Sequence, residues 1–199
     1  MTKKPRGRPR SYDPQKALGK ALESFWASGF ASTSLDDLAA ATGMNRPSLY
    51  AAFGDKKQLY LKSFEIFAGG VHAALTSLKE DSSPPRKALE RFYAEATEIY
   101  LSGPDGPRGC FIICTAPVEA ANDDDIREAL STVLSEIDKG LEAFFEKAKS
   151  KGELAKDTDA SARAKLAGAV LHSLAVRARA GETKQELQKL AREAVSLLT

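Results

Sequence analysis

The sequence has little of the chemistry from which disulfide frameworks and metal sites are built. It contains two cysteines, Cys110 and Cys114, and two histidines, His72 and His172. Two cysteines cannot form a disulfide framework, and their spacing fits neither a CxxC redox motif nor a zinc finger. Because no third ligand is evident beside the two sulfurs, and the histidines are far apart in the sequence, we expect reduced thiols and neither a metal nor a cofactor.

A hydrophobic run long enough to span a membrane is also lacking. The longest stretch without Asp, Glu, Lys or Arg is the 13-residue segment from Ile66 to Leu78, whereas a membrane-spanning helix needs about 18 or more apolar residues. The basic N-terminus is followed by SYDPQK, at the place where a signal peptide would have an apolar region. We therefore expect a cytoplasmic protein that does not enter a membrane.

A large excess of either charge is missing, but the charge is unevenly distributed. The net charge is +2, yet residues 1–62 hold 11 Lys and Arg against 5 Asp and Glu, and residues 63–199 hold 18 against 22. With 43% hydrophobic and 28% charged residues, the composition is that of a globular protein of one or two domains. The basic N-terminal portion is expected to meet a polyanion.

Alternating strand patterns do not recur, and capping residues with Pro and Gly punctuation divide the chain into helices. The exception is CFIICTAPV (110–118), whose β-branched residues also fit a strand. A single strand would have no partner in this chain, so we interpret it as a buried helix. The sequence predicts an all-α protein of about nine helices, at 13–29, 34–43, 45–54, 55–79, 83–101, 110–118, 123–151, 157–181 and 183–199.

The segment 34–53 has the pattern of a helix-turn-helix. Two short helices flank Thr42-Gly43-Met44-Asn45, where glycine allows a sharp bend. Apolar positions of both helices are expected to face inward, which leaves four residues outward: Arg46, Pro47, Ser48 and Tyr50. In a DNA major groove, Arg bonds guanine O6 and N7, Ser bonds a base or a phosphate, and the Pro ring contacts a thymine methyl. The alternative is an ordinary αα-corner whose outer face is solvated.

The string TSLDDLAAATGMNRPSLYAAFGDKKQLY closely resembles the signature of the TetR (tetracycline-repressor-like) family of bacterial transcription regulators. The resemblance is detailed over about residues 12–62 and architectural beyond them. It implies an all-helical homodimer with a three-helix DNA-binding domain that includes the helix-turn-helix (11–56) and a helical effector-binding and dimerisation domain (57–199). The basic residues before them form a separate arm (1–10). We expect no enzymatic activity, because the sequence lacks a phosphate-binding loop, a nucleophile–base pair and metal-ligand spacing.

The resemblance also implies which residues contact DNA. Arg46, Pro47 and Ser48 resemble the base-reading residues of the family, and Thr33, Tyr50 and Lys56 resemble its phosphate contacts. Lys56 stands at the start of the fourth helix, where backbone N–H groups and a cation can hold one phosphate together. The alternative for Lys56 is a solvated surface lysine. Pro47 departs from the Lys, Gly or Ala more usual at its position, so the operator sequence cannot be transferred from a relative.

The N-terminal arm KKPRGRPR contains PRGRPR, which looks like an AT-hook. In that interpretation Arg6 and Arg8 insert into a narrow A·T minor groove, where the negative potential is strongest. The alternative is a disordered basic tail that attracts DNA of any sequence.

Residues of the C-terminal part are candidates for an effector pocket, because aromatic side chains on inner helices can line a cavity. Core packing, and burial of the cysteines as small apolar residues, are the alternatives. Cysteine is also a possible sensor of oxidants or electrophiles. The candidates are Phe64, Phe67, Tyr93, Tyr100, Cys110, Phe111, Cys114 and His172.

The last two helices carry apolar stripes that predict a dimer surface. The stripes comprise Leu166, Ala167, Val170, Leu171 and Leu174, and Leu187, Leu190, Ala194, Val195 and Leu198. The sequence and the resemblance together predict a homodimeric repressor that a small-molecule effector releases from a palindromic, double-stranded DNA operator. A DNA-coating architectural protein without an effector is the alternative.

Overall fold

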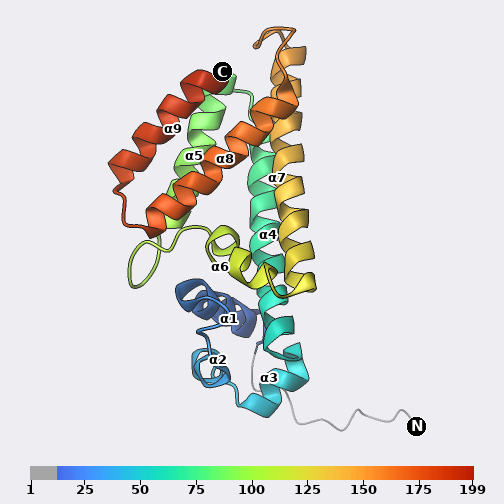
Figure 1. The fold of residues 1–199 in the computed structure, drawn as a ribbon, viewed down its shortest axis with the longest axis vertical. Coiled ribbons are helices and arrows are strands. Elements are labelled where there is room, and N and C mark those ends of the chain that lie inside the picture. Colours follow the sequence, from blue (N-terminus) through green and yellow to red (C-terminus); the bar gives the residue numbers. More distant parts are fainter. Residues whose placement is uncertain (1–12) are drawn as a thin grey trace, which may run out of the picture. The chain divides into compact units, whose positions relative to one another are not determined.

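The computed structural model describes residues 13–199, which form nine α-helices and no strand (Figure 1). This confirms the predicted all-α fold, and the run 110–118 lies within a helix rather than a strand. The helices are α1 (Pro14–Ser28), α2 (Leu35–Thr42), α3 (Arg46–Phe53), α4 (Lys56–Glu80), α5 (Pro85–Leu101), α6 (Phe111–Ala120), α7 (Asp124–Ser150), α8 (Ala160–Arg179) and α9 (Lys184–Leu198). None of the helices in the described residues is long and apolar enough to cross a membrane.

Two compact units divide the chain, the first ending at Ser63 and the second covering Phe64–Thr199. The start of α4 contributes to the core of the first unit, because its Leu59, Tyr60 and Ser63 are all buried. The Tyr60 ring meets the Phe25 ring of α1 edge-on, with centroids 5.2 Å apart.

Side-chain caps set the helix starts of the N-terminal unit. Asp13 accepts hydrogen bonds from the first turn of α1, and Asn45 accepts one from the Ser48 N–H at the start of α3. Ser34 and Asp37 form a reciprocal capping box on α2. These caps satisfy N–H groups that have no partner within their own helix, which explains why the sequence breaks its helices at these points.

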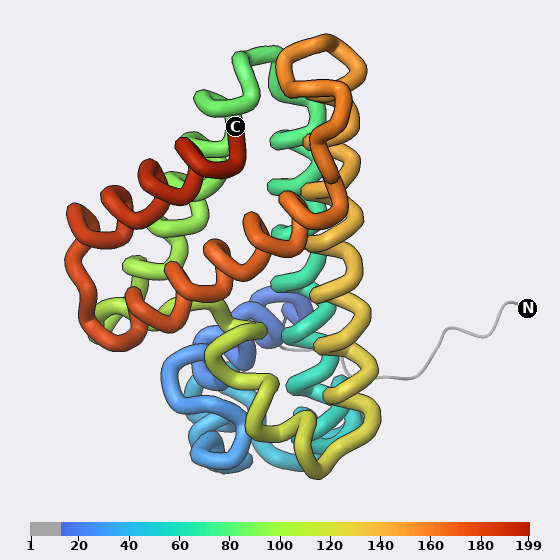
Figure 2. Tube along the Cα trace, turned by 45° about the horizontal axis from the view of Figure 1, so that its top comes forward, coloured from blue at the N-terminus to red at the C-terminus, as the bar shows by residue number. Residues whose placement is uncertain are grey.

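The C-terminal unit contains the remainder of α4 and helices α5–α9. In it α7 packs against α8, and α9 packs against α5 and α8 (Figure 2). Gly140 of α7 allows close contact with α4, because a Cβ there would lie 3.0–3.1 Å from atoms of Leu75. Leu141, Phe145 and Leu174 are among the side chains that fill the core.

The short helix α6 is held by its neighbours rather than by its own sequence. Pro117 lies inside it and provides no backbone N–H. Phe111, Ile112 and Ala116 are buried, and α6 packs against α7 and α8. Burial on these two helices accounts for the helical state of a β-branched segment.

Candidate nucleic-acid interface

A sharp bend joins α2 to α3. Gly43 adopts a left-handed conformation with φ of +67°, and the Met44 N–H donates to the Ala39 carbonyl at 3.2 Å. Met44 is buried together with Leu38 of α2 and Leu49 of α3. The chain thus ends one helix and begins another within three residues, around a shared apolar contact. This confirms the predicted helix-turn-helix.

The first turns of α3 present the predicted base-reading residues. Arg46, Pro47 and Tyr50 are exposed, and Ser48 is half-buried. Arg46 is the first residue of α3, and the N-terminal residues of a recognition helix are those that reach base edges in the major groove. The structure therefore brings the four outward residues of the prediction to one exposed end of a helix.

Arg46 contacts an acidic side chain across the bend. Its Nε donates to Asp36 Oδ1 at 2.7 Å, and a terminal guanidinium nitrogen donates to Asp36 Oδ2. The hydrogen bond from Arg46 lowers the pKa of the Asp36 carboxyl, and the pKa of Arg46 is raised in turn. In this structure the guanidinium is thus oriented by two hydrogen bonds to one carboxylate.

Lys56 is bound to the loop between α1 and α2. Its Nζ donates to the carbonyl oxygens of Phe30 and Thr33 at 2.9 and 3.0 Å, and it lies 4.4 Å from the centre of the Phe30 ring. Thr33 itself is 2% exposed, and its hydroxyl donates to the Gly29 carbonyl at 2.6 Å. Two of the three predicted phosphate contacts, Thr33 and Lys56, thus have partners inside the N-terminal unit, and Lys56 is not a freely solvated lysine.

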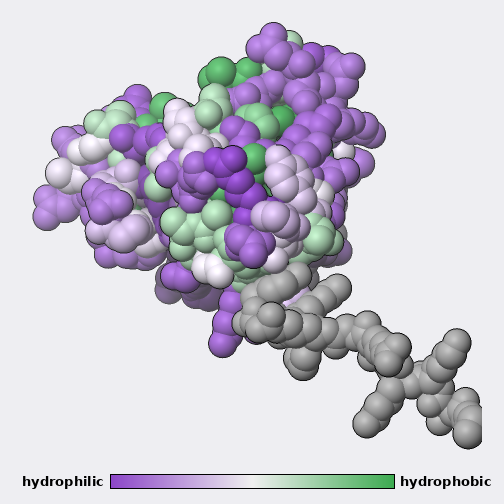
Figure 3. Space-filling view, turned by 90° about the horizontal axis from the view of Figure 1, so that it is seen from below, coloured by the Kyte–Doolittle hydropathy of each residue, from purple (hydrophilic) through white to green (hydrophobic). Residues whose placement is uncertain are grey.

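The basic arm falls outside the part of the chain that the structure describes, and Arg6 and Arg8 with it. The AT-hook interpretation and the basic-tail alternative therefore both stay predictions. Figure 3 shows one face of the molecule, on which hydrophilic residues predominate and hydrophobic residues form small separate patches.

The candidate effector residues form two groups in the C-terminal unit. In the first, the Phe111 ring lies 6.3 Å from the Phe64 ring and 5.7 Å from the Phe67 ring. Phe111 and Phe64 are buried and Phe67 is half-buried. Tyr93 is buried too, and its hydroxyl donates to the Ala167 carbonyl at 2.9 Å. These contacts are those of a packed core.

The second group surrounds the cysteines. Burial raises the pKa of Cys110 to about 12 and raises the pKa of the Tyr100 hydroxyl. Burial also raises the pKa of Cys114, although the nearby Arg179 opposes this. Both thiols are therefore protonated at neutral pH. Burial lowers the pKa of the His172 imidazole, and the nearby Asp138 opposes this shift.

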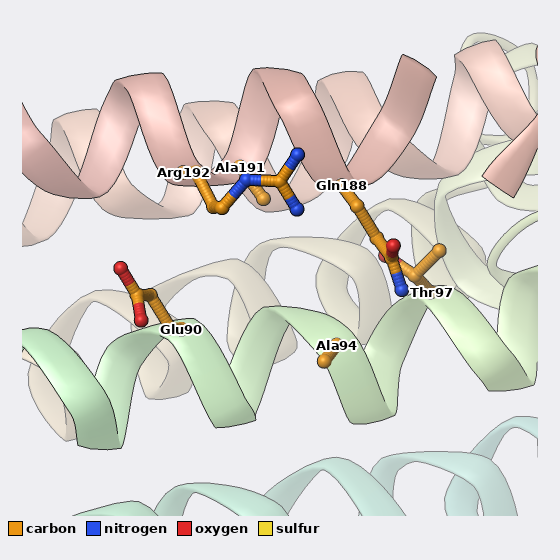
Figure 4. A pocket seen from close by; sticks show the side chains of 6 residues that line it. All are labelled: Glu90, Ala94, Thr97, Gln188, Ala191 and Arg192. Atoms are coloured by element: carbon orange, nitrogen blue, oxygen red, sulfur yellow. The ribbon is translucent and has the colours of Figure 1, made fainter. Parts of the chain in front are cut away.

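A cavity of about 230 Å³ lies between α5 and α9. The side chains at its wall come from both helices (Figure 4), and they are Glu90, Ala94, Thr97, Gln188, Ala191 and Arg192. None of them was among the predicted effector residues. Two small alanines face each other across this space, a feature that a search for aromatic residues does not detect.

Fewer residues of the predicted dimer stripes are exposed than the sequence suggests. Most of their residues are buried within their own chain, where α8 and α9 pack against α5, α7 and each other. The buried members are Ala167, Leu171, Leu174, Leu187, Val195 and Leu198. Large exposed side chains on the same two helices are Leu166, Val176 and Leu197, with exposed fractions of 60%, 53% and 85%.

Comparison with known families agrees with this arrangement. Residues 17–62 match the family described as bacterial regulatory proteins, tetR family, and residues 84–194 match the tetracyclin repressor-like C-terminal domain. Together the two matches cover most of the chain. It belongs to the TetR family. Members of this family are transcriptional regulators, in line with the expectation that the chain is not an enzyme.

Similar TetR proteins include the transcriptional repressor ComR of Escherichia coli, which is 30% identical over 192 residues, or 95% of this chain and 90% of ComR. The repressor BdcR of Escherichia coli is 33% identical over 107 residues, or 54% of each chain. Among solved structures, a cysteine-substituted CifR bound to a 26-base-pair operator DNA has a TM-score of 0.84, with 28% identity. That match covers 96% of this chain and 98% of CifR.

One residue beside the TetR recognition helix was not predicted from the sequence. Asp36 was not among the predicted site residues, yet it is the partner of Arg46. The available signal was the opposite charge of two outward residues on either side of a two-helix bend. Spacing within one helix does not reveal such a pair, because its members lie on different helices.

Proposed function

We propose that this TetR-family chain is a repressor that binds a pseudo-palindromic operator as a homodimer and leaves it when a small molecule binds the C-terminal unit. The observation that carries the proposal is the exposed first turn of α3, with Arg46, Pro47 and Tyr50 presented after the Gly43 bend. The names of ComR and BdcR as repressors, and the operator DNA bound by CifR, support the same function.

In this proposal Arg46, Pro47 and Ser48 read bases in the major groove, and Tyr50 contacts a phosphate. An ammonium group has three N–H donors, and Lys56 uses two of them on Phe30 and Thr33. The third donor is left for a phosphate. The hydroxyl of Thr33 is buried, so its contribution is to close the loop that Lys56 binds rather than to offer the hydroxyl to DNA.

The homodimer is proposed to form through the exposed apolar positions of α8 and α9, centred on Leu166, Val176 and Leu197. Large exposed apolar side chains on two helices that pack against each other can be covered by a partner at an interface. A two-fold pairing would join four helices and supply two copies of α3. The two half-sites would then lie about one turn of DNA, or slightly more, apart.

The effector is proposed to bind within residues 64–199. A ligand releases DNA only if it binds more tightly to a conformation with low DNA affinity. Two places support this proposal: the cavity between α5 and α9, and the aromatic group around Phe111, which would have to open to admit a ligand. The chemical identity of the effector does not follow from either.

Footprinting on the promoter of the protein's own gene tests the proposal. We expect one protected palindrome that disappears when an effector is added, and Arg46→Ala should reduce preference for the contacted base pair roughly 10- to 100-fold. Continuous protection that no small molecule reverses would favour an architectural DNA-coating protein instead. Protection of nothing at low ionic strength would contradict both functions.

A further inference from the structure

The side chain that Arg46 contacts has its own role, and this inference rests on the base-reading role proposed above for Arg46. We propose that Asp36 is a positioning residue for DNA recognition. Its carboxylate holds the Arg46 guanidinium in the orientation that reads a base, and it weakens the attraction of the same surface for DNA of random sequence. Asp36 would thereby raise the ratio of specific to unspecific binding.

The placement of the two residues is the first step. Asp36 is the second residue of α2 and Arg46 the first of α3, so their ion pair spans the helix-turn-helix bend. One bond joins Arg46 Nε to Asp36 Oδ1 at 2.7 Å, and a second joins a terminal nitrogen to Oδ2. Two parallel bonds between a planar guanidinium and a planar carboxylate fix direction as well as distance.

The capping box of α2 does not use this carboxylate. The cap of α2 is made by the neighbouring Asp37, which accepts from the Ser34 N–H at 2.8 Å and from the Ser34 hydroxyl at 2.6 Å. The Asp36 and Arg46 side chains are 72% and 53% exposed, and exposed ion pairs add little to stability. Orientation of Arg46 therefore explains the pair better than stability does.

The two bonds to Asp36 leave the outer edge of the Arg46 guanidinium, with a donor on each terminal nitrogen, able to bond a base. A guanidinium has five N–H donors, and Asp36 takes one from Nε and one from a terminal nitrogen. Three donors remain, among them one on each terminal nitrogen. These two match the O6 and N7 acceptors of guanine. Because the group is planar, fixing its inner edge also fixes the direction of this outer edge.

The carboxylate has opposite effects on the two modes of DNA binding. Immobilising a flexible side chain only on binding weakens an interaction by about two- to tenfold, and Asp36 removes this loss when Arg46 meets the correct base. A negative charge near phosphates also weakens binding to any sequence. The expected sum is a modest cost in affinity with a gain in discrimination.

The test compares Asp36→Asn with the matched control Asp37→Asn. Each variant removes one negative charge, one position apart, but only the first removes the two-bond contact, because the amide nitrogen of Asn is a donor. The probes are the footprinted operator, its single-base-pair variants and a random duplex, each titrated at several salt concentrations. Thermal melting checks that both variants are folded.

We expect Asp36→Asn to reduce preference for the base pair contacted by Arg46 about two- to tenfold and to tighten binding to the random duplex. Asp37→Asn should tighten random binding without losing the preference. In an Arg46→Ala background, Asp36→Asn should have no further effect on preference, because its target is gone.

Four results would overturn the inference. If Asp36→Asn tightens operator and random duplex equally, Asp36 is only a competing charge. If the two Asn variants lose preference equally, the contact with Arg46 is irrelevant. If Arg46→Ala removes the base preference and Asp36→Asn leaves it intact, the inference alone fails. Should Arg46→Ala itself change no preference, the proposed base-reading role fails with it.

Discussion

Replacing Lys56 by methionine removes the ammonium that ties α4 to the loop between α1 and α2, while keeping an apolar stem against Phe30. Two hydrogen bonds are lost, from Nζ to the carbonyls of Phe30 and Thr33 at 2.9 and 3.0 Å. A hydrogen bond to a charged group contributes about 1.5–3 kcal/mol when it is well buried, and these are partly buried. A cation–π contact adds about 0.5–1 kcal/mol.

Counting each partly buried bond at about 0.75 kcal/mol and the cation–π contact at about 0.5 kcal/mol, we expect Lys56→Met to reduce the unfolding free energy of the N-terminal unit by about 2 kcal/mol. Trp26 is the single tryptophan of the chain and lies buried in α1, so its fluorescence reports on this unit. With a urea dependence of about 1 kcal/mol per molar, the midpoint should fall by roughly 2 M.

The matched control is Lys16→Met, which removes one positive charge from an exposed position of α1. Its midpoint should stay close to that of the unaltered chain, since exposed single charges contribute little. Equal midpoints for the two variants would refute the structural role of Lys56. DNA binding at several salt concentrations then separates the two functions of Lys56: a flatter salt dependence for Lys56→Met than for Lys16→Met would support the phosphate contact.

Three further predictions concern the C-terminal unit. Leu197→Glu, at a side chain that is 85% exposed on α9, should dissociate the dimer in sedimentation experiments. The control Ile99→Glu on α5 should leave the dimer intact. If both variants remain dimers, this part of α9 does not belong to the dimer interface. Gly109 has φ of +67°, and a Cβ there would lie 2.4 Å from a backbone oxygen. Gly109→Ala should therefore reduce stability in thermal melting by at least about 1–3 kcal/mol. The control Gly69→Ala, in open space within α4, should be neutral or stabilising by up to about 1 kcal/mol. Burial raises the pKa of Cys110 from 9.0 to about 12, so between these pH values unfolding releases a proton. The free energy of unfolding should therefore fall as pH rises from 9 toward 12, by up to about 1.4 kcal/mol per pH unit. A Cys110→Ala variant with the same pH dependence of stability would contradict this.

Local signals explain why the helices were predictable from the sequence. Caps such as Ser34 with Asp37, or Thr183 with Glu186, satisfy N–H groups three residues away, and the structure has both capping boxes. The Gly43 bend is equally local, because only the backbone conformation of one residue decides it. Features that depend on a few consecutive residues can be recognised without knowing the tertiary structure.

Contacts between helices were harder to predict from the sequence. The sequence identified Arg46 as an outward residue and Lys56 as a cation at a helix start, but their partners Asp36 and Phe30 lie 10 and 26 residues away. Similarly, the apolar stripes of α8 and α9 show which positions avoid water but not whether the covering surface belongs to the same chain. Leu174 is fully buried within its own chain, whereas Leu197 is exposed.

Prediction of an effector pocket from the sequence is limited for a different reason. Aromatic residues were chosen because they line many pockets, but a large side chain such as Phe111 also fills space, and here it packs against Phe64 and Phe67. A cavity is the volume that side chains leave unfilled, and it forms more readily where small residues face each other. The space between α5 and α9 has Ala94 and Ala191 in its wall. Filling it from one side, with Ala94→Leu, is therefore a more direct test of effector entry at this place than altering any aromatic residue of the core.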